Sequence, residues 1–138
     1  MSLPIKPGDI ITNDELMSIF ACAPRGGMRK SKTTNSLILI SDKVGDNPYV
    51  DTGLRYTGMG KSGDQDINYR QNRTLATSRN TSIEIHFFEV NDACLYEYIG
   101  QVELADDPYR ETQKGEDGID RKVWIFPLRI KKEQNDSI

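Results

Sequence analysis

Short apolar segments with the two-residue alternation of β-strands constrain the fold of this chain more than any other feature. Residues 81–90 and 96–104 alternate in this way, and 37–40 is a continuous apolar run typical of a buried strand. Gly100 interrupts the second of these segments and predicts a bulge. The strongest segment places four large apolar side chains on one face: Trp124, Phe126, Leu128 and Ile130.

One short helix is expected near the N-terminus. Thr12 and Glu15 have the spacing of a capping box, and apolar residues follow at helical spacing up to Cys22. Long polar connections are expected at 24–35, 41–64 and 105–121. These elements predict an α+β, mainly β fold: a small, strongly curved β-barrel with one or two short helices and long loops.

Composition excludes several classes of protein. The 138 residues suffice for one domain, and they contain one histidine, His86, and two cysteines, Cys22 and Cys94. Three such side chains are too few for a four-ligand zinc site, and one histidine cannot form a His-Asn-His nuclease centre. His86 is expected to be an ordinary strand residue. No secretory signal or membrane span is evident. We therefore expect a cytoplasmic, non-catalytic chain with reduced cysteines and no cofactor.

The net charge of −3 is unusual for a nucleic-acid-binding protein, but the charges are segregated. Residues 25–32 carry four positive charges and no negative ones, whereas 103–120 is rich in acids. A basic face opposite an acidic one can orient a polyanion. The same distribution is equally compatible with charged loops that only interact with solvent.

A glycine-rich segment follows an aromatic residue and a hydroxyl residue. Its order is Tyr56-Thr57-Gly58-Met59-Gly60, and Gly63-Asp64-Gln65 comes shortly afterwards. Glycines permit tight turns and close approach of a ligand or of another backbone. The spacing of Gly60-Lys61-Ser62 does not fit a phosphate-binding Walker loop. From composition alone, a solvated glycine-rich hairpin loop is the simpler interpretation.

A larger pattern resembles a known family. Tyr56-Thr57-Gly58-x-Gly60, Asp64-Gln65 and Asn72-Arg73-x-Leu75-Ala76 are similar to the signature of the SRA (SET- and RING-associated) domain, and 121–129 resembles its last strand. The resemblance covers about residues 35–131. It implies a PUA-like β-barrel that recognises modified cytosine in DNA. The whole chain most resembles the N-terminal module of methylation-dependent restriction endonucleases that carry a C-terminal His-Asn-His (HNH) nuclease.

The resemblance also implies roles for individual residues in a pocket for an extruded base. Tyr56 would stack on the base, Thr57 would contact it, and Gly58 with Gly60 would let the loop approach it closely. A carboxylate before the Tyr-Thr pair would accept from the cytosine amino group. Three residues of the gapped upstream segment are candidates for this pocket: Asp46 first and Asp51 second as the carboxylate, and Tyr49 as a second stacking face.

Other residues are expected to support this pocket. Asp64 and Gln65 would brace the loop through hydrogen bonds to its backbone. Six basic residues are candidates for phosphate binding: Arg25, Arg29, Lys30, Lys32, Arg73 and Arg79. Against this hypothesis, Tyr56 could be only a half-buried strand residue.

The leading hypothesis is a domain, residues 1–131, that binds double-stranded DNA with 5-methylcytosine or 5-hydroxymethylcytosine by base flipping. Residues 132–138 would then form a polar tail or the start of a linker to a fused nuclease domain. The alternatives are a PUA-like RNA-binding domain, an independent hydrolase, and a protein-interaction barrel. The sequence leaves open which modification is bound and whether the chain forms a homodimer.

Overall fold

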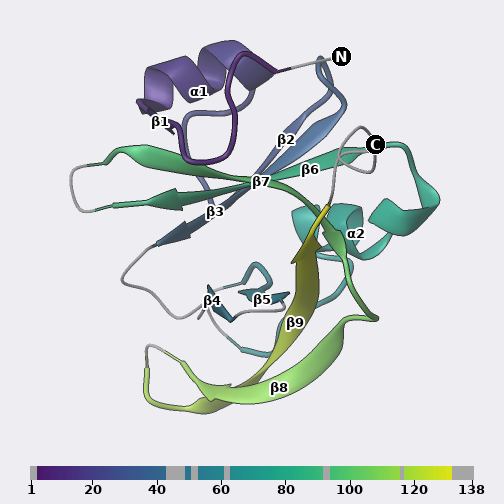
Figure 1. Ribbon diagram of the computed structural model, residues 1–138. Helices are drawn as coiled ribbons and strands as arrows, with labels where there is room; N and C mark the ends of the chain where they lie inside the picture. Colours follow the sequence, from purple (N-terminus) through teal and green to yellow (C-terminus); the bar gives the residue numbers. More distant parts are fainter. Residues whose placement is uncertain are drawn as a thin grey trace.

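The computed structural model describes residues 3–42, 49–50, 53–60, 63–91, 94–115 and 117–131, which form a curled sheet with short helices (Figure 1). The elements in chain order are β1 (Ile10–Ile11), α1 (Asn13–Phe20), β2 (Met28–Ser31), β3 (Ser36–Asp42), β4 (Tyr49–Val50), β5 (Gly53–Thr57), α2 (Gln71–Ala76), the 3-10 helix η1 (Ser78–Asn80), β6 (Glu84–Val90), β7 (Tyr96–Leu104), β8 (Tyr109–Lys114) and β9 (Asp120–Ile130).

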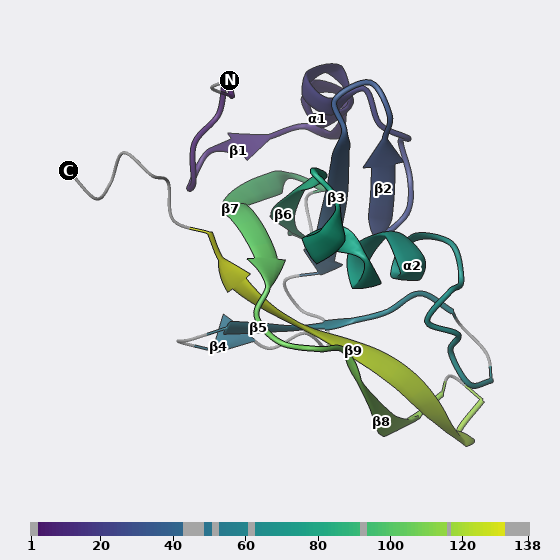
Figure 2. The same cartoon turned by 90° about the vertical axis from the view of Figure 1, so that its right-hand side faces the viewer.

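The described strands join into one sheet with the order β2-β3-β6-β7-β9-β5-β4, and β1 and β8 pair with β7 and β9. β3 and β6 are parallel, whereas the other pairs of described strands are antiparallel. β9, β8 and β5 turn away from β2, β3 and β6, so the sheet curls into a half-barrel (Figures 1 and 2). The predicted mainly β, strongly curved fold is confirmed.

Apolar side chains cover both faces of the sheet around β3 and β6. Leu37 and Leu39 point into the inner core of the curl, with Leu75 of α2. Ile38 lies on the outer face, where it packs with Phe20 of α1. A strand buried on both faces needs apolar residues at successive positions. This arrangement explains the unbroken apolar run that predicted a buried strand.

Helix α1 begins as the sequence predicts. The Thr12 side chain accepts from the backbone N–H of Glu15 at 3.2 Å, and the Glu15 carboxylate accepts from the backbone N–H of Thr12 at 2.9 Å. The helix ends at Ala21, which adopts a left-handed conformation with φ of 52°. No helix in the described ranges is long and apolar enough to span a membrane.

Gly100 marks the predicted irregularity in β7. The pairing of β6 with β7 shifts register between Phe87 and Phe88, and Gly100 lies opposite Phe87. Its φ of 143° is a conformation that other residues rarely adopt. The expected bulge is therefore confirmed.

All three expected loops contain strands. Residues 41–64 include β4 and β5. Residues 24–35 include β2, and residues 105–121 include β8. The strands β2 and β8 are polar, because β2 lies at one edge of the sheet and β8 pairs only with β9 among the described strands. Strands whose stability comes from pairing with one neighbour need no apolar alternation of their own, so the alternation pattern missed them.

Candidate nucleic-acid interface

Tyr56, the predicted stacking residue, lies in β5 and is only 4% exposed. Its hydroxyl oxygen is 2.7 Å from the carbonyl oxygen of Gly27 and 3.0 Å from that of Ile40, so one O–H proton serves two acceptors. Its ring meets Phe87 edge-on at 6.0 Å between centroids. Burial raises the pKa of the phenol. The ring is thus part of the inner core, with its hydroxyl anchoring the segment before β2.

The residues proposed for the opposite wall of the pocket are not described by the structure. Asp46 and Asp51 lie outside the described residues. Tyr49 belongs to β4, where its backbone pairs with Leu54, but its side chain is not described. Thr57 ends β5 and is half-buried. A base pocket formed by these residues and Tyr56 therefore stays a prediction.

The glycine-rich segment after β5 is fixed by two buried side-chain amides. A Cβ atom added at Gly58 would lie 2.9 Å from Oδ1 of Asn72 and 3.1 Å from Oε1 of Gln65. Cβ atoms essentially never lie as close as 2.9 Å to a neighbouring atom, so the contact with Asn72 leaves no room for a side chain at position 58. Glycine at position 58 thus admits two amides of this chain itself. Close approach of a nucleotide to Gly58 stays a prediction, and the two amides are a second reason for glycine at this position.

Gln65 connects this segment to β9. Its Nε2 donates to the carbonyl oxygens of Gly58 at 2.8 Å and Gly60 at 3.1 Å, and its Oε1 accepts from the backbone N–H of Trp124 at 2.9 Å. Asp64 beside it accepts from the backbone N–H of Lys122 at 2.8 Å. Gln65 therefore binds the backbone of the loop and that of β9, as expected of a bracing residue. The Asp64 carboxylate binds the backbone of β9.

Asn72 was given no role by the sequence hypothesis, although it lies within the motif. It is fully buried, its Oδ1 accepts from the backbone N–H of Met59 at 2.7 Å, and its Nδ2 donates to the carbonyl oxygens of Met59 and Asp66, each at 3.0 Å. It thereby attaches α2 to the glycine-rich segment. The available signal was a polar residue three positions before Leu75, on the same buried helix face.

Arg29 is a correction to the predicted phosphate-binding set. It is 4% exposed, its Nε donates to the carbonyl oxygen of Gly26 at 2.9 Å, and its Nη1 donates to Oδ1 of Asn13 at 2.7 Å. The guanidinium also lies 5.6 Å from the centre of the Tyr96 ring. Because its charge is enclosed between β2, α1 and β7, Arg29 stabilises the fold and is not presented to a polyanion.

The other predicted phosphate ligands are all exposed, but they do not form one group. Arg25 and Lys32 lie on either side of β2's buried residues. Lys30 and Arg73 line a common cavity beside α2. Arg79 lines a different cavity and forms an ion pair with Asp107. The structure therefore brings together only Lys30 and Arg73 of the six.

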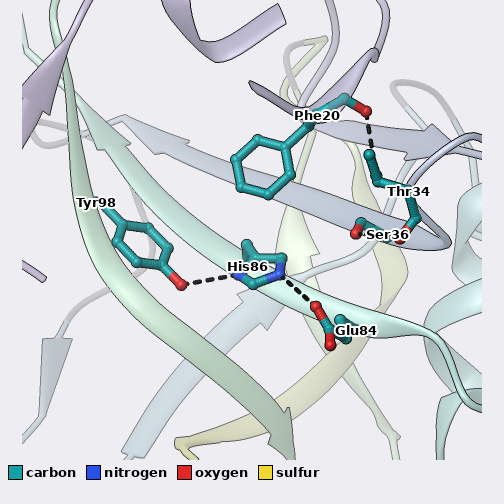
Figure 3. Close-up of polar contacts among 6 residues, drawn as sticks. All are labelled: Phe20, Thr34, Ser36, Glu84, His86 and Tyr98. Carbon is teal, nitrogen blue, oxygen red and sulfur yellow. Dashed lines mark hydrogen bonds and ion pairs between the residues drawn. The ribbon is translucent and has the colours of Figure 1, made fainter. Parts of the chain in front are cut away.

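His86 lies in β6, as expected for a strand residue, and its ring is buried (Figure 3). Its Nδ1 is 2.8 Å from the hydroxyl of Tyr98, and its Nε2 is 3.2 Å from the carboxylate of Glu84. The ring also packs against Phe20 of α1 at 4.9 Å between centroids. Burial lowers the pKa of the imidazole, so the neutral form donates from Nε2 to Glu84 and accepts from Tyr98. His86 thereby joins α1 to the sheet.

The sequence matches the family model for the SRA domain of ScoMcrA-like proteins over residues 7–136. No curated protein sequence matches it significantly. The fold is similar to the structure of the sulfur-binding and SRA domains of ScoMcrA complexed with phosphorothioated DNA, with a TM-score of 0.75 and 18% identity over 95% of this chain and 42% of that one.

Two further structures are similar. The type IV phosphorothioation-dependent restriction endonuclease ScoMcrA matches with a TM-score of 0.72 and 18% identity over 95% of this chain and 29% of that one. The SRA domain of SUVH5 with hemi-methylated CG DNA matches with a TM-score of 0.72 and 22% identity over 96% of this chain and 94% of that one. This chain thus spans less than half of the ScoMcrA chains. At these identities, the likeness establishes a common fold.

Proposed function

This chain belongs to the family of ScoMcrA-like SRA domains, and from that membership we propose that it binds double-stranded DNA containing modified cytosine, in the cytoplasm, by turning the base out of the helix. The family match over residues 7–136 carries the proposal. SRA domains of similar fold are known in complexes with hemi-methylated and fully hydroxymethylated CG DNA. The chain itself acts as a recognition domain in this proposal, and a linked HNH endonuclease would cut the DNA.

The proposed base pocket uses Tyr56 and Thr57 at the end of β5. A base in a duplex exposes only its groove edges, so inspection of the whole ring requires extrusion at a cost of a few kcal/mol. Stacking on an aromatic side chain returns roughly 1–3 kcal/mol. In the proposal, Tyr56 supplies that ring and Thr57 contacts the base. Because Tyr56 is 4% exposed, an extruded base can stack on its ring only after the groups that bury the ring move aside.

The proposal can be tested with a binding series on matched duplexes. They would carry cytosine, 5-methylcytosine, 5-hydroxymethylcytosine or its glucosylated form, with a phosphorothioate duplex and an RNA of the same sequence for comparison. We expect one of the modified-cytosine duplexes to bind at least tenfold more tightly than the plain one. Equal affinity for modified and plain cytosine would overturn the proposal, and tightest binding to RNA would favour the PUA-like RNA-binding alternative.

Substitutions at Tyr56 separate stacking from folding. Tyr56→Leu keeps an apolar side chain in the core but removes the ring, and we expect it to abolish the preference for modified DNA. Tyr56→Phe keeps the ring and loses the hydrogen bonds to Gly27 and Ile40, which costs about 1–3 kcal/mol of stability. We expect this variant to keep the preference. A folded Tyr56→Leu protein with an unchanged preference would remove Tyr56 from the pocket.

Asp46→Asn and Asp51→Asn identify the carboxylate that we propose to accept from the cytosine amino group. A carboxylate can only accept, whereas an amide presents both a donor and an acceptor, so the correct substitution weakens the contact with cytosine. We expect Asp46→Asn to reduce the affinity for modified duplexes more than Asp51→Asn does. A larger loss of affinity in Asp51→Asn would assign the contact to Asp51. If neither substitution changes the affinity, neither carboxylate makes the contact.

A further inference from the structure

A cavity of about 280 Å³ lies between α2, β2 with the turn that follows it, and residues 81–83 before β6. α2 lies close to β2 in Figure 2. Three of the residues lining the cavity are positively charged, and none is acidic. The cations are Lys30 of β2, Arg70 just before α2 and Arg73 within it; we call this space the cationic cavity.

The charges of the cationic cavity are not compensated. Lys30, Arg70 and Arg73 form no ion pair with a carboxylate in the part of the chain that the structure describes, whereas Arg79 pairs with Asp107 and Arg129 with Glu103. Unpaired cations that line one concave surface produce a stronger local potential than the same number of paired ones. The cavity is therefore positive although the whole chain carries a net charge of −3.

Arg70 was not singled out from the sequence, and its backbone is unusual. Its φ of 48° and ψ of −123° are rarely adopted by residues other than glycine. Such a conformation costs of order 1–3 kcal/mol and persists only where surrounding contacts impose it. Backbone hydrogen bonds of 3.0 Å from Tyr69 to Asp66 and from Asn72 to Tyr69 hold the turn. The Arg70 guanidinium lies 5.4 Å from the centre of the exposed Tyr69 ring.

The neutral groups of the cationic cavity offer little specificity. The Thr74 hydroxyl donates to Oε1 of Gln71 at 2.7 Å, and the Thr77 hydroxyl donates to the carbonyl oxygen of Arg73 at 2.8 Å. With these donors already engaged, charge dominates what the cavity can attract. A group that is strongly anionic and carries several acceptor oxygens suits three cationic donors best.

We propose that the cationic cavity binds a phosphodiester of the DNA backbone, with Arg70 as the central ligand and Lys30 and Arg73 beside it. This proposal rests on the proposed function, since it names where the same DNA ligand is held. Asn72 lies between Arg70 and Arg73 and is bonded to Met59 of the glycine-rich segment. The phosphate-binding site therefore lies at a fixed distance from the glycine-rich segment. A phosphate bound there would determine which nucleotide of the duplex faces that segment.

The salt dependence of duplex binding tests this proposal. Each phosphate contact contributes about 0.9 to the slope of the logarithm of affinity against the logarithm of salt concentration. We expect Arg70→Gln, Arg73→Gln and Lys30→Gln each to reduce the slope by up to that amount. Between 50 and 200 mM salt, the loss of affinity then shrinks by up to about 3.5-fold. The triple variant should reach this limit and not exceed it, because the three side chains share one phosphodiester.

Arg129→Gln is the matched control, because it removes the same charge from an arginine paired with Glu103 outside the cavity. It should leave the slope near that of the unmodified chain. Modified and plain duplexes should lose affinity equally in the three cavity variants. If the cavity variants and Arg129→Gln give the same slope, the phosphate site is wrong even where the preference for modified cytosine is intact.

The two proposals fail separately. Equal affinity for modified and plain duplexes would overturn cytosine recognition. If the salt dependence of binding still falls in the cavity variants, the phosphate site is nevertheless supported. A chain that binds no duplex at 50 mM salt overturns both. Thermal unfolding of each variant checks that the fold is intact, and we expect little change because the three side chains are exposed.

Discussion

The cationic cavity has a neighbour that differs from it in charge far more than in size. A second cavity of about 350 Å³ shares Thr81 and Ile83 with it, and is lined by Arg79 and Lys131 together with two acids, Glu84 and Glu103. We call this the mixed cavity. Residues 81–83 thus separate a positive surface from one in which the charges balance.

The comparison shows why position in the sequence is a poor guide to a phosphate ligand. Arg73 and Arg79 are six residues apart, and the sequence makes both of them candidates for phosphate binding. Arg73 lines the cationic cavity, whereas Arg79 lines the mixed cavity and pairs with Asp107. An exposed ion pair contributes little to stability, but it largely cancels the field that would attract a polyanion. The partner of each arginine, more than its presence, decides what it can bind.

The largest effect on the difference between the cationic cavity and the mixed cavity is expected from Asn72→Ala. The substitution removes three hydrogen bonds of a fully buried side chain and frees α2 from Met59 and Asp66. We expect a loss of about 2–4 kcal/mol in the free energy of unfolding, measured by urea denaturation. The cationic cavity should lose its shape because α2, which forms one of its walls with Arg73, is no longer held in place. The mixed cavity should keep its shape because no residue of α2 lines it.

Gln71→Ala is the control for this change, since it alters the same helix at a half-buried position. It removes only the acceptor for the Thr74 hydroxyl. We expect a loss below about 1 kcal/mol, the usual net contribution of one such bond. Equal destabilisation by both substitutions would mean that Asn72 has no special part in holding α2.

An intermediate effect is expected when the cationic cavity is made to resemble the mixed one. Thr77→Glu introduces a carboxylate among Lys30, Arg70 and Arg73, where opposite charges near a protein surface interact by roughly 1–4 kcal/mol. We expect about tenfold weaker binding of all duplexes at low salt, measured by fluorescence anisotropy.

Ser82→Glu makes the same change in net charge within the mixed cavity. It should leave the affinity for duplexes within about twofold of that of the unmodified chain. Were Ser82→Glu to weaken binding as much as Thr77→Glu, the two cavities would act as one electrostatic surface and the contrast between them would disappear.

The smallest effect is expected from pH, and it concerns the mixed cavity through Glu84. Burial lowers the pKa of His86 below its ordinary value of 6.5. The unfolded chain therefore binds the proton more readily, so this group's stabilisation is complete above pH 6.5 and is lost as the pH falls through the lowered pKa. The free energy of unfolding should decrease below pH 6.5 more in the natural chain than in His86→Gln. Parallel pH profiles for the two proteins would contradict this assignment.

The sequence predicted those elements of the fold whose own residues carry a pattern. The Thr12–Glu15 capping box, the apolar run in β3, and Gly100 in β7 were each identified, because local geometry or burial on both faces required those residue types. β2 and β8 were missed because their neighbours determine their conformation. A polar edge strand becomes visible only once its partner is placed.

The site was predictable only in part, for a related reason. Gln65 was expected to bind the loop backbone, and its amide does donate to Gly58 and Gly60. The burial of Arg29 and the role of Asn72 depend on residues more than ten positions away, such as Asn13 and Met59. A list of charged residues cannot distinguish an arginine that faces solvent from one enclosed by distant parts of the chain.

The parallel pairing of β3 with β6 has a consequence for how such domains diverge. Ser36–Asp42 and Glu84–Val90 lie side by side, and the chain between them contains β5, the glycine-rich segment and α2. β5 is fixed by its own pairing with β9, so this excursion is anchored in the middle. Insertions and deletions before or after β5 can therefore accumulate independently, without disturbing the ladder on either side. Related domains should therefore differ most in these two stretches and keep the same strand pairing.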